Sequence, residues 1–353
     1  MDRRAFLRWL LGTAAAGAIG LTGLWRFARP VTAPEGESVA AAATAEPSPG
    51  RQAFIGAAET GGALLSFAIL SDLHINPDLP ERAQHLRHAF DDLKAFETRV
   101  EAVIMTGDQT DYGRDRDYKE LAGVMKKYKL PPVYANMGNH DYYNIWMDKS
   151  DNFSRETMPN GKTDEGSRRA FQQFFEVEKP YSEGQVNGFT FLMMSQEAYV
   201  QEKPEVSEGC WYSEEQLKWL EAKLAGQEKG RPVFVMIHQP LPEAGSDGGA
   251  HRVIPAKRFR AILKGHPNVF VFSGHTHQDF KNGQPHYVKE SFHWFQNSSV
   301  GRVLNRQFQN DRENEAQGLY VQVFEDKVVV RAREFTSRSW IAGSEWKVAL
   351  RKA

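Results

Sequence analysis

The sequence predicts an α/β fold in which buried strands alternate with amphipathic helices. Short apolar runs recur along the chain, a pattern that is typical of strands covered on both faces. Segments with apolar residues at helical spacing lie between these runs. The residues just after the runs are mostly Asp, Asn and His, and in an open α/β sheet the carboxyl ends of neighbouring strands meet at one crevice. These observations favour one large domain with its functional site at the strand ends.

The first half of this domain contains three predicted strands and two predicted helices. Leu86, Phe90 and Leu93 form the buried stripe of the first helix. In chain order the elements are a strand at 64–70, a helix at 81–96, a strand at 100–105, a helix at 116–129 and a strand in PPVYANM (131–137). Residues 144–180 are polar, and we expect an irregular excursion there rather than a core element.

The second half continues the alternation and ends in a hairpin. Ser213 is expected to cap the helix that follows it, together with Gln216 three residues later. The predicted elements are a strand at 189–195, a helix at 213–226, a strand at 232–238, a helix at 256–264, a strand at 269–277 and a hairpin that turns at Glu325-Asp326-Lys327. We expect the aromatic run FHWF (292–295) to lie on the rim of the site.

Composition excludes several classes of protein. The 353 residues contain 41% hydrophobic residues, which is ample material for a core. With 44 basic and 45 acidic side chains the net charge is −1, so the chain lacks the basic footprint of a nucleic-acid binder, and no nucleic-acid polymer is expected as a partner. Cys210 is the single cysteine, which excludes an internal disulfide and a CxxC site. We expect Cys210 to be an inert packing residue.

The N-terminal segment predicts export from the cytoplasm. Arg3, Arg4 and Arg8 precede an uncharged run rich in Ala and Gly, and AATA (42–45) offers a cleavage point after small residues. RRAFLR resembles the twin-arginine export motif, although Asp2 replaces the usual hydroxyl residue, so the resemblance implies the twin-arginine export machinery as a partner. The alternative is an uncleaved membrane anchor, because the run is close to the lower limit for a span. Either reading places the body outside the cytoplasm, as a secreted, periplasmic or envelope-associated protein.

This reading divides the chain into four segments. They are a signal peptide and spacer at 1–45, a flexible linker at 46–60, the main domain at 61–335 and a C-terminal tail packed on that domain at 336–353. The Pro-, Ala-, Gly- and Ser-rich composition before residue 52 is typical of a spacer.

Five clusters of polar residues follow predicted strands. Carboxylates together with imidazoles suit manganese, iron, cobalt or zinc, and the absence of thiolates excludes a cysteine-type zinc site. The set exceeds the ligands of one catalytic ion, so two ions are the economical reading, with a carboxylate able to bridge them. The clusters are Asp72 and His74, Asp108 and Asp111, Asn139 with His140 and Asp141, His238, and His275 with His277.

The same clusters resemble the motifs of the calcineurin-like metallophosphoesterases. They read DLH (72–74), GDQTD (107–111), GNHD (138–141), IHQP (237–240) and GHTH (274–277), and all five occur in the family's order. The match is most similar to the bacterial phosphodiesterase branch. The resemblance implies a metallophosphoesterase fold in which two mixed β-sheets are sandwiched between helices, as α/β/β/α layers.

The resemblance also implies a role for each site residue. Asp72, His74 and His277 would hold one metal ion, and Asn139, His238 and His275 would hold the other. Asp108 would bridge the two ions. His140 would act as general acid over the leaving group, with Asp141 orienting its ring, and Asp111 would brace a ligand or its loop from behind.

The implied function is that of an exported phosphoric ester hydrolase with two divalent transition-metal ions. A hydroxide bridging the ions would attack a small-molecule phosphate ester in line, and a phosphodiester is the favoured substrate. One alternative is a phosphomonoesterase or nucleotidase that uses the same site. An alternative of another class is a non-catalytic metal-binding or cell-envelope interaction protein. A redox function is disfavoured because the chain has no CxxC and no dinucleotide-binding glycine loop.

Four residues are candidates for contact with the substrate. Tyr142, Tyr143 and Trp146 directly follow the GNHD motif and are expected either to stack a base or sugar ring or to pack against neighbouring loops. His251 is expected to engage a second phosphate or to remain a solvated surface residue. His85 and His88 have no acidic partners in frame on their predicted helix and are interpreted as surface residues.

Overall fold

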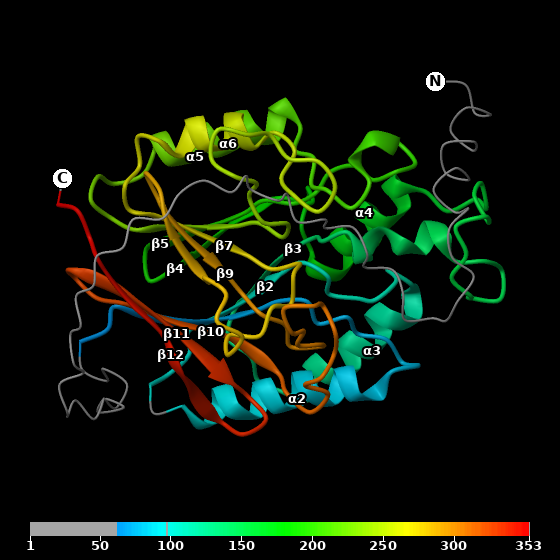
Figure 1. The fold of residues 1–353 in the computed structure, drawn as a ribbon, viewed down its shortest axis with the longest axis horizontal. Helices are drawn as coiled ribbons and strands as arrows, with labels where there is room; N and C mark the ends of the chain where they lie inside the picture. The colour runs from blue at the N-terminus through cyan, green and yellow to red at the C-terminus, as the bar shows by residue number, and fades with distance from the viewer. Residues whose placement is uncertain (1–61, 97, 353) are drawn as a thin grey trace, which may run out of the picture. The chain divides into compact units, whose positions relative to one another are not determined.

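Two six-stranded mixed sheets form the centre of the fold (Figure 1). The first consists of β1 (Leu65–Leu70), β2 (Ala102–Thr106), β3 (Val133–Asn136), β10 (Gln317–Val323), β11 (Lys327–Glu334) and β12 (Ser339–Ala349), in the order β12-β11-β10-β1-β2-β3. The second consists of β4 (Ser182–Val186), β5 (Phe189–Met193), β6 (Val233–Met236), β7 (Val269–Ser273), β8 (Tyr287–Lys289) and β9 (His293–Gln296), in the order β4-β5-β6-β7-β9-β8.

The computed structural model describes residues 62–96 and 98–352. The predicted signal peptide, its cleavage point and the linker at 46–60 therefore lie outside the described residues. In the part that is described, no helix is long and apolar enough to cross a membrane.

Helices cover the outer face of each sheet. Figure 1 shows α5 (Glu214–Ala225) and α6 (Ala256–Leu263) on one side of the strands, with α2 (Pro80–Ala95) and α3 (Asp115–Met125) on the opposite side. The remaining helices are α4 (Asp164–Phe175) and the 3₁₀ segments η1 (His140–Trp146) and η2 (Pro204–Val206). The predicted arrangement of two mixed sheets between helices is thus confirmed.

The layers follow from the two-residue period of the strands. In β1, Leu65, Phe67 and Ile69 face the second sheet, while Ala68 and Leu70 pack with the α2 and α3 side of the core. Both sets are buried, which explains why β1 has a continuous apolar run rather than an alternating one. A third apolar cluster lies between the second sheet and helices α5 and α6.

The carboxyl ends of the parallel strands decide where the site lies. β1, β2 and β3 pair in parallel in the first sheet, as do β5, β6, β7 and β9 in the second. Residues after β1, β2 and β3 therefore emerge at one edge of the first sheet, and residues after β6 and β7 emerge at the corresponding edge of the second.

Several expected elements differ from those observed. The polar stretch 144–180 contains α4, which begins where the Thr163 hydroxyl accepts a hydrogen bond of 2.9 Å from the amide of Gly166. The run FHWF does not lie on the rim, because Phe292 is fully buried and the next residues form β9. His85 is buried and lies 3.1 Å from the carbonyl oxygen of Gly301, so its assignment to the surface was wrong.

The C-terminal segment contains a strand of the first sheet. β12 pairs antiparallel with β11 from Ser339 to Ala349, and its Ile341 and Val348 belong to the apolar layer between the sheets. The hairpin predicted around Glu325-Asp326-Lys327 is observed as β10 and β11. Ser213 caps α5, since its hydroxyl accepts a hydrogen bond from the Gln216 amide.

Candidate metal centre

The ligand side chains converge because the backbone turns sharply after each strand. Asp72, His74 and Asp108 have φ values of 53°, 48° and 49°, and His275 and His277 have values of 71° and 55°. Non-glycine residues adopt this left-handed conformation at a cost of about 1 kcal/mol or more each, and such strain concentrates at functional sites.

Glycines beside the ligands allow close approach of the two sheets. A side chain on Gly107, whose φ is 77°, would collide with the His238 ring. A side chain on Gly138 would collide with the Asp108 carboxylate. These two positions require glycine, so the GD and GN pairs of the motifs have a steric cause.

The first group of ligand atoms belongs to Asp72, His74, Asp108 and His277, whose atoms lie within 4.8 Å of one another. The Nδ1 atom of His74 lies 3.1 Å from Asp111 Oδ1, and that of His277 lies 3.0 Å from a main-chain oxygen. Both acceptors require an Nδ1–H donor, which leaves a lone pair on each Nε2. These two Nε2 atoms are only 3.0 Å apart, an arrangement that a shared cation would stabilise.

The second group is Asp108, His238 and His275, so Asp108 belongs to both groups. His238 donates from Nδ1 to the carbonyl oxygen of Thr106 at 2.9 Å. Its Nε2 is buried without a hydrogen-bond partner in the described chain and lies 3.1 Å from Asp108 Oδ2. Asn139 joins this group, because its Oδ1 lies 3.0 Å from His275 Nδ1. The unpartnered nitrogen and the facing acceptor atoms fit a second cation.

Electrostatics favour the metal-binding forms of Asp72 and His74. Burial alone would raise the pKa of Asp72, but His277 and His238 outweigh burial and lower it to about 2. Burial, reinforced by the charge of His140, lowers the pKa of His74 to about 3. Carboxylates are therefore ionised and His74 is neutral at pH 7, as metal coordination requires. Burial would lower the pKa of His238, yet the carboxylates of Asp108 and Asp72 raise it to about 9, so a cation bound between these groups would compete with a proton on His238.

Comparison of the sequence with known protein families identifies the family of this chain. Residues 65–279, more than half of the chain, match the calcineurin-like phosphoesterase family. The chain belongs to this family. All seven predicted ligands of this calcineurin-like phosphoesterase lie together at the sheet edges, in two groups that share Asp108.

One relative of this chain has a named activity. The 3',5'-cyclic adenosine monophosphate phosphodiesterase CpdA of Escherichia coli is 22% identical over 188 residues, which are 53% of this chain and 58% of CpdA. This chain therefore matches little more than half the length of that relative.

Among solved structures, a dimetal phosphatase from Danio rerio superposes with a TM-score of 0.57 at 16% identity, covering 82% of this chain and 100% of the other. A purple acid phosphatase from yellow lupin seeds gives a TM-score of 0.56 at 12% identity, covering 81% of this chain and 53% of that one. Both likenesses show the shared fold.

The His140 ring contacts Asp111 and not Asp141, which was the expected partner. Its Nδ1 lies 3.0 Å from the main-chain oxygen of Asp111 and 3.5 Å from Oδ1 of the same residue. Asp141 instead accepts hydrogen bonds from the amides of Gly138, Gln109 and Thr110 and therefore ties two motif turns together. His140 begins a 3₁₀ segment with three residues per turn, so the next side chain leaves in another direction.

Two of the four substrate candidates are in the core. Tyr142 is fully buried and donates a hydrogen bond of 2.8 Å to the Gln196 carbonyl oxygen, while Trp146 is buried among apolar residues. Neither can contact a substrate, because the 3₁₀ turn directs both inward. Tyr143 stacks on the His140 ring at 4.1 Å, and His251 Nδ1 lies 3.2 Å from His275 Nε2.

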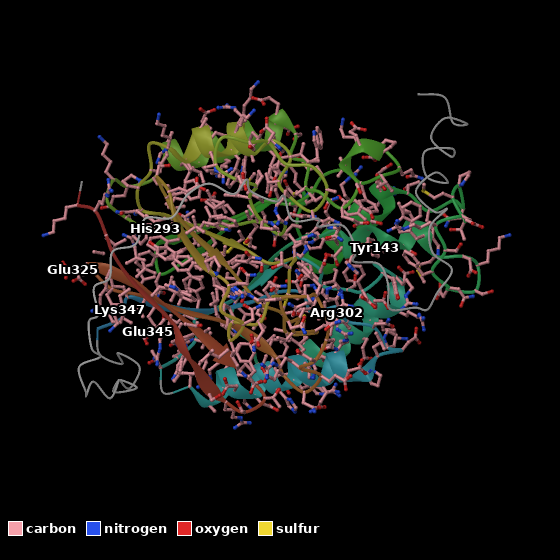
Figure 2. The ribbon with its side chains drawn as sticks, in the orientation of Figure 1. Tyr143, His293, Arg302, Glu325, Glu345 and Lys347 are labelled. Carbon is pink, nitrogen blue, oxygen red and sulfur yellow. The ribbon has the colours of Figure 1, made fainter. Side chains whose placement is uncertain are left out.

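Two further residues border the centre without any motif to signal them. Glu208 accepts a hydrogen bond of 2.9 Å from the amide nitrogen of Asn139. Arg302 accepts the His277 hydrogen bond through its main-chain oxygen, and its positive charge acts against protonation of His277 and His140. The Arg302 Nε is buried and has no hydrogen-bond partner within the described ranges. Both residues lie in loops outside the five motifs, which is why sequence patterns missed them. Figure 2 shows Arg302 and Tyr143 in the same half of the molecule, away from Glu325 and Glu345.

Proposed function

We propose that this protein hydrolyses phosphate esters with a pair of divalent transition-metal ions, which are manganese, iron, cobalt or zinc. The observation that supports the proposal most directly is Asp108, a buried carboxylate common to two ligand groups. Asp72, His74 and His277 would hold one ion, and Asn139, His238 and His275 the other. When bound, such a pair supplies a nucleophile derived from water and stabilises negative charge on the phosphoryl oxygens.

His140 supplies the proton for the departing alkoxide. Its ring is fixed on one side by the main-chain oxygen of Asp111 and on one face by Tyr143. Burial disfavours its charged form, but the carboxylates of Asp108 and Asp111 outweigh burial and raise its pKa above the ordinary value. A positioned general acid of this kind contributes about 10²–10⁴-fold to the rate.

The favoured substrate is a small phosphodiester. The partial similarity to a cyclic-nucleotide phosphodiesterase supports this choice. The Arg302 guanidinium supports an anionic ligand, since its buried Nε has no partner among the residues described here.

Export through the twin-arginine route completes the proposal and is supported by the RRAFLR sequence. Replacing both Arg3 and Arg4 with Lys should retain the protein in the cytoplasm, and unchanged export would contradict that route.

A pair of model esters tests the activity. The metal-loaded full chain should hydrolyse bis(4-nitrophenyl) phosphate with a higher kcat/KM than 4-nitrophenyl phosphate. His140→Ala should keep both metals and lose about 10²–10⁴-fold in kcat on a phosphodiester with a poor, alkoxide leaving group, and less on the 4-nitrophenyl esters. His88→Ala, which removes a histidine bonded to Gln84 on the surface of α2, is the matched control and should retain full activity. Failure of the two-metal protein to hydrolyse either ester would overturn the proposal.

A further inference from the structure

We propose that Glu208 is a positioning residue, which turns the oxygen of Asn139 toward the second metal ion and holds Tyr143 against His140. The inference rests on the proposed function only in assuming that the second ligand group binds metal. Glu208 lies outside all five motifs, in the loop that follows η2.

The contact with Asn139 selects one orientation of its amide. Asn139 Nδ2 donates to Glu208 Oε2 at 2.9 Å, while Asn139 Oδ1 lies 3.0 Å from His275 Nδ1. A carboxylate accepts hydrogen bonds but cannot donate them, so it pairs only with the NH₂ side of the amide. The oxygen, which is the metal-binding atom of asparagine, is thereby directed toward the second ligand group. Glu208 thus acts through Asn139 and is not itself a ligand in either group.

The same carboxylate reaches the general acid through Tyr143. The Tyr143 hydroxyl donates to Glu208 Oε2 at 2.9 Å, and its ring stacks on His140 with an angle of 29° between the planes. Tyr199 donates to the other oxygen, Oε1, at 2.8 Å. Burial raises the pKa of the Tyr143 hydroxyl, and the charge of Glu208 raises it further, so Tyr143 remains a donor at neutral pH.

The Glu208 carboxylate accepts hydrogen bonds from neighbouring side chains, but its ion pair with Arg155 is long and partly exposed. Its side chain is 12% exposed, and the neighbouring Arg155 guanidinium is 3.6 Å away and 47% exposed. A carboxylate this far from water requires positive charge nearby to offset its desolvation. A cation held by Asn139 would provide that charge.

The loop that presents Glu208 is fixed to the loop that presents His251. The Cys210 amide donates to the Arg252 carbonyl oxygen at 2.9 Å, and Cys210 forms an isolated bridge with Val253. His251 contacts His275, so the two joined loops touch two of the three residues that would hold only the second ion. The two loops together therefore support Asn139 and His275 at the second ligand group.

Calorimetric titration of the metal-free full chain with Mn²⁺ tests the role of Glu208. We expect wild type to bind two ions and Glu208→Gln to weaken the second by about 10–100-fold, because the substitution removes the negative charge beside Asn139. Affinity for the first ion should be unchanged. Glu205→Gln is the matched control, since Glu205 is exposed in η2, three residues before Glu208. Tyr143→Phe, which removes hydrogen bonds to Glu208 and Asn139, should weaken the second ion in the same direction and also lower kcat on a phosphodiester with an alkoxide leaving group.

Each outcome of the titration decides the matter. Equal weakening of both ions by Glu208→Gln, or no weakening, would overturn the proposal, as would a wild type that binds a single ion. If Glu208→Gln does not fold, Tyr199→Phe removes one anchor of the carboxylate and should weaken the second ion in the same direction. A wild type that binds two ions but hydrolyses no ester would refute the proposed function while the Mn²⁺ result for Glu208 still stands.

Discussion

At the scale of single residues, Asp111 supports two histidines at once. Its Oδ1 lies 3.1 Å from His74 Nδ1, its Oδ2 accepts from Asn76 Nδ2 at 3.1 Å, and its main-chain oxygen contacts His140. Asp111→Ala would remove the side-chain acceptor of His74 Nδ1 and release the orientation of His74. We expect about 10–100-fold weaker binding of the first metal ion, measured by titration with Mn²⁺. Binding as tight as in wild type would show that Asp111 does not hold His74.

Arg302 offers a second test at this scale. If its guanidinium binds a phosphoryl or other anionic oxygen of the substrate, Arg302→Gln removes a charge-assisted hydrogen bond worth about 1.5–3 kcal/mol. KM for bis(4-nitrophenyl) phosphate should then rise by about 10–100-fold with a smaller change in kcat. Arg306→Gln is the matched control, because Arg306 is an exposed arginine on the same loop. An unchanged KM for Arg302→Gln would place the substrate elsewhere.

Residue types in motifs could be predicted from sequence, whereas side-chain directions could not. Asp72, Asp108 and His238 follow apolar runs, and strand ends meet by topology, so their proximity could be inferred. The partners of His140 and the burial of Tyr142 depend on a short 3₁₀ segment whose rotation per residue has no sequence signature.

At the scale of elements, the turn between β11 and β12 depends on one buried carboxylate. Glu334 accepts hydrogen bonds from the amides of Thr336 and Ser337 at 2.9 Å and 2.7 Å and from Ala316 at 3.2 Å. Burial would raise its pKa, but these hydrogen bonds outweigh burial and lower the pKa below its ordinary value. A lowered folded-state pKa means that the carboxylate stabilises the fold above its unfolded pKa, near 4.3, and loses this effect as the pH falls through the folded value.

Glu334→Gln should therefore lower the free energy of unfolding by about 1–3 kcal/mol at pH 7. Urea denaturation at a series of pH values should show the difference between variant and wild type shrinking below about pH 4.3. A difference that stays constant from neutral to acidic pH would contradict the account of this turn.

Long elements with clear periodicity were predictable, and those stabilised by tertiary contacts were not. The stripe of Leu217, Leu220 and Leu224 and the Ser213 cap define α5 in the sequence. β9 has only four residues and is stabilised by pairing with β7 on one side and with the three-residue strand β8 on the other. No local pattern could assign FHWF to a strand rather than to a rim loop.

At the scale of the whole molecule, the C-terminal strand completes the first sheet. β12 covers β11 and brings Ile341 and Val348 into the layer between the sheets. Deleting residues 339–353 would expose the β11 edge and remove two buried apolar side chains, at a cost of about 3–6 kcal/mol. We expect a loss of soluble monomer in size-exclusion chromatography. A truncation after Arg351 is the control, and equal behaviour of the two truncations would contradict the role of β12.

The central claim concerns the whole molecule, because side chains from both sheets must share Asp108 between two ions. Elemental analysis of the purified full chain after loading with Mn²⁺ measures this most directly. The account predicts two ions per chain in wild type and one or none in Asp108→Ala, with secondary structure unchanged by circular dichroism. Two ions retained by folded Asp108→Ala, or fewer than two in wild type, would contradict it.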